Sequence, residues 1–157
     1  MKTETGEGIP PVTPVYFDSA LIAKFYVNEP GRDVVRALAG TAGIVVTSRI
    51  AVAEISAAFH RKYREGTVEP RVFKALQGQF AKDLSDGLWR LVSPTEALLD
   101  EVRSLFSKLD KAIFLRSIDA LHLVTAKAEG FACLYSNDRH LLNACAHLGI
   151  EGVNPIA

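Results

Sequence analysis

Short runs of hydrophobic residues alternate along the chain with longer segments in which hydrophobic residues recur every three or four positions. The short runs are rich in β-branched and aromatic residues and predict buried strands, whereas the longer segments are typical of amphipathic helices. The expected strands are 15–17, 44–47, 88–92, 133–136 and 151–153. The expected helices are 19–27, 32–39, 49–64, 70–86, 96–109, 117–129 and 138–148.

The regular exchange of strand and helix predicts the fold class. Parallel strands need crossover connections, and helices in those connections cover both faces of the sheet. We therefore expect an α/β fold with three layers, α/β/α, around a central and mainly parallel sheet. In such sheets ligands bind beyond the carboxyl ends of the strands, so polar residues that follow a strand are the first candidates for a site.

Length and composition place limits on the domain organisation and on partners. With 157 residues the chain suits one domain, which we expect at 15–157 after a flexible, proline-containing lead at 1–14. The formal net charge is zero, so any RNA-binding surface must be local. Cys133 and Cys145 lack metal-ligand spacing, which favours a reducing cytoplasm. Charged residues interrupt every apolar run, so no membrane span is expected.

Four acidic residues follow the predicted strands or begin the predicted helices. Asp18 directly follows the first strand and Asp138 the fourth, while Glu54 and Asp119 lie in the first turns of two helices. These positions predict that the four side chains face one rim of the sheet. Carboxylates gathered in this way repel one another, and a hard divalent cation such as Mg²⁺ relieves the repulsion.

Each acid also has a purely structural interpretation. Asp18 and Asp138 occupy positions typical of helix N-caps, and Glu54 and Asp119 are favourably placed in first helical turns. However, Glu54 and Asp119 have mainly apolar neighbours in the sequence, where an uncompensated charge is costly to bury. The residues alone leave both interpretations open.

Four motifs around these acids resemble those of PIN-domain ribonucleases, particularly the VapC toxins of bacterial toxin–antitoxin pairs. The first is DSALIAKFYVNEPG at 18–31, and the second is SRIAVAE at 48–54. The third is LRSIDALHL at 115–123, and the fourth is SNDRHL at 136–141. The end of the chain, LGIEGVNP at 148–155, is also similar to the usual family ending. The resemblance covers nearly the whole chain, with the motifs in order.

This resemblance implies a PIN-like fold, endoribonuclease activity and dependence on Mg²⁺ or Mn²⁺. It also implies that the acids serve as metal ligands and catalytic groups, namely Asp18, Glu54, Asp119 and Asp138. Ser136 matches a small hydroxyl residue that precedes the last acid and orients a carboxylate or a metal-bound water. Ser19 either contributes its hydroxyl or, more simply, caps the first helix. Ala20 departs from the family, where Ser or Asn is common.

Basic residues near the acids are candidates for holding RNA. Arg49, Arg116 and Arg139 each lie within a few residues of an acid and can contact phosphate oxygens, with Arg116 the preferred candidate. The alternative is that these arginines pair with the acids and neutralise them. His122 lies one helical step from Asp119 and either orients it or is simply packed in the helix.

The resemblance further implies a VapB-like antitoxin whose C-terminal segment covers the acidic rim, and a homodimer formed through helices. Four aromatic residues either form a groove for such a partner or belong to the core: Phe59, Tyr63, Phe73 and Phe80. A catalytically quiet PIN-like module that binds RNA or a protein is the main alternative function. A receiver or haloacid-type phosphatase is a second, but the phosphatase needs Asp-x-Asp where this chain has Asp18-Ser19-Ala20.

Overall fold

The computed structural model describes residues 12–157. Most of the predicted flexible lead, residues 1–11, lies outside the described residues. Within them no helix is long and apolar enough to cross a lipid bilayer.

Strands and helices alternate as the hydrophobic pattern predicts. The strands are β1 (Val15–Tyr16), β2 (Val45–Ser48), β3 (Trp89–Val92), β4 (Cys133–Tyr135) and β5 (Glu151–Val153). The helices are α1 (Ser19–Tyr26), α2 (Arg32–Ala42), α3 (Ala51–Arg64), α4 (Pro70–Ser85), α5 (Glu96–Lys108), α6 (Ser117–Ala128), α7 (Arg139–Cys145) and the short 3₁₀ helix η1 (Ala146–Leu148).

The strands pair in parallel, which confirms the predicted α/β class. β2 lies between β1 and β3, and β4 pairs with β5. A parallel bridge between Phe17 and Tyr135 joins the two groups, and the Asp18 amide donates to the Tyr135 carbonyl at 3.1 Å. The strands therefore follow the spatial order β3, β2, β1, β4, β5, and the carboxyl ends of β1 and β4 lie side by side.

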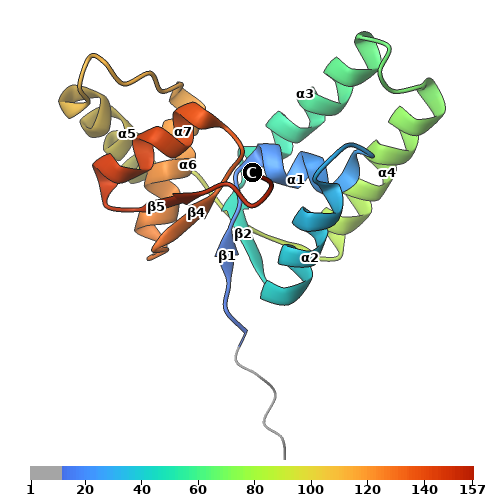
Figure 1. Cartoon of the computed structure of the whole chain (residues 1–157), viewed down its shortest axis with the longest axis horizontal. Helices are drawn as coiled ribbons and strands as arrows, with labels where there is room; N and C mark the ends of the chain where they lie inside the picture. Colours follow the sequence, from blue (N-terminus) through green and yellow to red (C-terminus); the bar gives the residue numbers. More distant parts are fainter. Residues whose placement is uncertain (1–11) are drawn as a thin grey trace, which may run out of the picture.

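Helices cover the strands in two groups, with α1 to α4 on one side of Figure 1 and α5 to α7 on the other. Successive residues of a strand point to opposite faces of the sheet. Phe17 accordingly joins a core with Phe59 and Trp89, whereas Tyr16 joins a second core with Leu123. The segment that leads into Asp18 is therefore anchored in both cores.

Most element boundaries agree with the sequence-based prediction to within two residues, and two differ by more. Helix α2 was expected to end before Gly40, but it continues to Ala42. A glycine in a helix interior costs only about 1 kcal/mol relative to alanine, so it does not by itself end a helix. The end comes at Gly43, whose φ of +75° is a left-handed conformation that favours glycine. The last helix is also shorter than expected, because η1 replaces its final turn.

The four aromatic residues of the predicted groove divide between core and surface. Phe59 and Phe80 are buried, and their rings contact one another edge to face. Tyr63 is 39% exposed and stacks on Phe73 with ring centroids 4.6 Å apart. Only the second pair is available to a partner.

Candidate functional site

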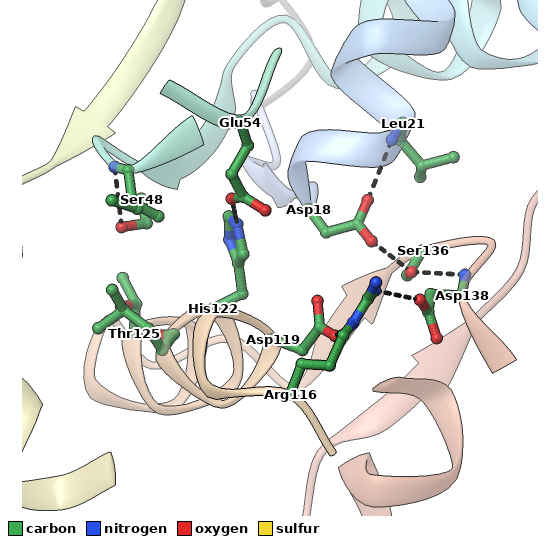
Figure 2. A network of polar contacts seen from close by, with 12 residues as sticks. Asp18, Leu21, Ser48, Glu54, Arg116, Asp119, His122, Thr125, Ser136 and Asp138 are labelled. Atoms are coloured by element: carbon green, nitrogen blue, oxygen red, sulfur yellow. Dashed lines mark hydrogen bonds and ion pairs between the residues drawn. The ribbon is translucent and has the colours of Figure 1, made fainter. Parts of the chain in front are cut away.

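The structure brings the predicted acidic residues to one edge of the sheet. Asp18 follows β1 and Asp138 follows the neighbouring β4, while Glu54 and Asp119 lie in the first turns of α3 and α6. Figure 2 shows that the side chains of Asp18, Asp119 and Asp138 approach one another around Ser136 and Arg116. Glu54 lies on the side of Asp18 that is away from Asp138, and its carboxylate points toward His122 on α6.

Asp18 is almost fully buried, and each of its carboxylate oxygens has a separate partner. Oδ1 accepts a hydrogen bond from the Leu21 amide at 3.0 Å, which makes Asp18 the N-cap of α1. Oδ2 accepts from the hydroxyl of Ser136. The N-cap role expected for Ser19 is wrong, because Ser19 is already the first residue of the helix. Burial raises the pKa of Asp18 to about 6, although the hydrogen bond from Ser136 acts in the opposite direction.

Asp138 is arranged in a similar way. Its Oδ1 accepts from the amides of His140, at 2.8 Å, and Leu141, at 3.2 Å, and so caps α7. Its own amide donates to the Ser136 hydroxyl oxygen at 2.9 Å. Because the same hydroxyl donates to Asp18, the buried Ser136 connects the two aspartates.

Arg116 pairs with the two acids of the second half of the chain. Its Nε donates to Oδ2 of Asp119 and its Nη2 donates to Oδ2 of Asp138, both at 2.7 Å. The hydrogen bond to Asp119 and the nearby Asp138 charge raise the pKa of Arg116. The neutralising interpretation of Arg116 is thus the one seen in the structure. Arg49 instead lies against Ser93, at 3.4 Å, and Arg139 is exposed.

Glu54 belongs to a second chain of hydrogen bonds through a fully buried histidine. His122 Nε2 lies 2.7 Å from Oε1 of Glu54, and its Nδ1 lies 2.9 Å from the hydroxyl of Tyr16. The Ser48 amide donates to the same hydroxyl oxygen at 3.2 Å. Burial raises the pKa of Tyr16, so the hydroxyl keeps a proton that it can donate to Nδ1, and Nε2 then carries the proton that Glu54 accepts.

His122 is fully buried and contacts Glu54, which agrees with the interpretation of a packed histidine and not with that of a histidine that orients Asp119. A histidine within the mainly apolar stretch 118–126 was the signal for this position. Nothing in the sequence marked Tyr16 as its partner, because a tyrosine in a buried strand is ordinary core material. Phe114 was also missed: it is 58% exposed, and its ring lies edge-to-face against that of His140, two residues after Asp138, with centroids 4.7 Å apart.

The donor chemistry of these residues suits a hard divalent cation, since Mg²⁺ prefers carboxylate oxygens. Their positions, however, do not form a ready metal-binding site. Among residues 12–157 no group of three or more acidic, histidine or cysteine side chains is positioned as a metal-binding cluster. Arg116 lies between Asp119 and Asp138, and Glu54 is turned to His122. The carboxylate chemistry fits such a cation, and a cation that bound Oδ2 of Asp119 and Oδ2 of Asp138 would have to displace Arg116 from these atoms.

Comparisons with known proteins are consistent with this architecture. The protein-family model described as PIN domain matches residues 15–146. VapC20 of Mycobacterium tuberculosis, described as a sarcin-ricin loop cleaving toxin, is 17% identical with a TM-score of 0.66, over 83% of this chain and 94% of that chain. FitAcB from Neisseria gonorrhoeae is 17% identical with a TM-score of 0.67, over 90% and 97%. No curated protein matches the chain in sequence.

Proposed function

Because this chain belongs to the PIN-domain family, we propose that it is a metal-dependent endoribonuclease. The carboxylates that we assign to catalysis and to metal binding are Asp18, Glu54, Asp119 and Asp138. One observation carries the proposal: acids from three remote segments of the chain are joined through Ser136 and Arg116 into one connected group. Structural helix caps alone do not require such a convergence.

The reaction we propose is hydrolysis of an RNA phosphodiester bond. A bound Mg²⁺ or Mn²⁺ supplies a Lewis acid that activates water and stabilises charge on the departing oxygen. The water oxygen bonds to phosphorus, the bond from phosphorus to the 3′ oxygen breaks, and that oxygen leaves with a proton. The products carry a 5′ phosphate and a 3′ hydroxyl.

The protein contributes by fixing the directions of its carboxylates. The cap bonds hold one oxygen of Asp18 and one of Asp138 in place, so the other oxygens keep a defined direction. Ser136 sets the spacing between these two residues, and His122 holds Glu54. Preorganised groups of this kind need little rearrangement during the reaction.

Mapping of product ends tests the proposal. Purified protein is incubated with end-labelled RNA in Mg²⁺ or in excess EDTA, alongside Asp18→Asn and Asp119→Asn. The control is Asp33→Asn, because the Asp33 side chain is 96% exposed on α2. We expect cleavage only with Mg²⁺, only in wild type and control, and with 5′ phosphate ends. Full activity in EDTA, or 2′,3′-cyclic phosphate ends, would contradict the mechanism.

A catalytically quiet module is the alternative, and the pairing of Arg116 with two of the acids favours it. That module would bind RNA without cutting it. In the same experiment it predicts RNA binding without cleavage in every protein and every metal condition.

The toxin role, a VapB-like antitoxin and a homodimer in the cytoplasm belong to the same proposal. Their support is the family, the similarity to a described toxin, and the stacked pair of the exposed Tyr63 and the half-buried Phe73. We expect the protein to co-purify with the product of an adjacent gene. The double variant Tyr63→Ala, Phe73→Ala should no longer retain that partner.

A further inference from the structure

We propose that Arg116 is an exchangeable counter-cation: it holds Asp119 and Asp138 together, and it leaves both when a divalent cation binds. The inference rests on the proposed function, because it concerns the same carboxylates. It adds a specific event that neither the family nor the acidic motifs assign, namely the replacement of one cation by another.

The geometry of the contact is a bridge between two elements. Nε and Nη2 are different nitrogens of one planar group, and each donates to a different carboxylate at 2.7 Å. Asp119 belongs to α6, whereas Asp138 precedes α7. A guanidinium can span two acids in this way, but a compact lysine ammonium on its flexible stem does so poorly.

The bridge and a metal ion compete for the same atoms. Both nitrogens contact Oδ2 atoms, and on Asp138 this is the oxygen that the cap bonds leave free. Mg²⁺ binds oxygens at about 2.1 Å and demands a defined octahedral shell. A guanidinium at hydrogen-bond distance from these oxygens excludes that shell, and its positive charge opposes a second cation.

Arg116 is also the partner that can move. Its side chain is 60% exposed, whereas those of Asp119 and Asp138 are 10% and 22% exposed. Asp138 is additionally fixed by the amides that it caps. Release therefore requires rotation of an exposed side chain and no loss of core packing. Once released, the guanidinium is free to contact a substrate phosphate, which unites the two roles weighed for it from the sequence.

Direct measurement of cation binding tests the exchange without any activity assay. Mg²⁺ titration calorimetry compares wild type, Arg116→Gln and Arg139→Gln. Arg139 is the matched control because it is exposed and adjacent to Asp138 in sequence, so its replacement removes the same formal charge from the chain. A second readout is the Tm of each protein in EDTA and in excess Mg²⁺.

We expect Arg116→Gln to bind Mg²⁺ about fivefold more tightly than Arg139→Gln, which corresponds to the loss of a partly exposed ion pair. In EDTA its Tm should fall below that of the control, and Mg²⁺ should remove the difference. If wild type binds Mg²⁺ and the two variants bind it with equal affinity, the exchange is overturned but the proposed function is left intact. Absence of Mg²⁺ binding in all three proteins overturns both.

Discussion

At the scale of single residues, two of the proposed catalytic acids have two functions at once. Asp18 gives one oxygen to the Leu21 amide and the other to Ser136, and Asp138 divides its oxygens between α7 and Arg116. Helix capping and site chemistry are therefore compatible, although the sequence offered them as alternatives. The cap bond restricts rotation of each carboxylate, which prepares its second oxygen for a ligand.

The Tyr16 hydroxyl is the residue-scale feature with the clearest energetic consequence. Replacing Tyr16 with Phe leaves the Ser48 amide and His122 Nδ1 buried without a partner, and such groups cost about 1–3 kcal/mol. We expect Tyr16→Phe to lower the free energy of unfolding by that amount in urea titrations. Tyr135→Phe is the control, since Tyr135 is half-buried and packs its ring edge-to-face on Phe17. Equal stabilities of the two variants would show that this hydrogen-bond chain contributes nothing.

At the scale of elements, Glu29 ties the end of α1 to α3. Its carboxylate accepts from Lys24 of α1 at 2.8 Å and from Lys62 of α3 at 2.9 Å. This gives a physical reason for the acid in the first motif, where it precedes Pro30 and Gly31. The contact holds α1 in place, and α1 is the helix that Asp18 begins.

The pH dependence of this link follows from its charges. Partial burial raises the pKa of Glu29, but hydrogen bonds from Lys24 and Lys62 outweigh it and lower the pKa below the ordinary value of 4.5. An acid with a lowered pKa stabilises the fold above its ordinary value, and this stabilisation is lost as pH falls through the lowered one.

Glu29→Gln is therefore expected to lower the free energy of unfolding at pH 7, by about 1 kcal/mol for a partly exposed group. The difference from wild type should shrink below pH 4.5 and vanish at lower pH. Thermal unfolding across this range measures it, with the more exposed Glu65→Gln as control. A difference that stays constant with pH would mean that charge plays no part.

Element boundaries show where sequence reasoning stops. The strands are recognisable because their residues are apolar and β-branched, and these properties are local. Whether α2 ends at Gly40 or at Gly43 is not decided locally, because both glycines lie near the end of the same amphipathic segment. Only the fold decides it, by placing Gly43 at a positive φ and leaving Gly40 in a helix that packs normally.

At the scale of the whole molecule, the gathering of the acids was predictable, but their partners were so only in part. Pairing with Arg116 was one of two interpretations, whereas the contact of Glu54 with His122 was not predicted. Parallel strands bring Asp18 and Asp138 to the same edge, whatever the details of the side chains. The contacts of Arg116 and of Glu54 depend instead on how α6 and α3 are rotated about their axes. That rotation is set by both cores together, so the partner His122 could not be derived from spacing.

The convergence of acids predicts a conflict between stability and function across the molecule. Asp18 is 3% exposed, and burying its charge opposes folding. Asn at this position keeps an oxygen for the Leu21 amide but carries no charge, so Asp18→Asn should be at least as stable as wild type in EDTA. Excess Mg²⁺ should reverse the order, because a ligand at 100 times its Kd stabilises the protein that binds it by about 2.7 kcal/mol. Thermal unfolding of both proteins in both conditions measures this. An Asn variant that is less stable in EDTA would show that the carboxylate serves the fold, and that no cation is needed to explain its position.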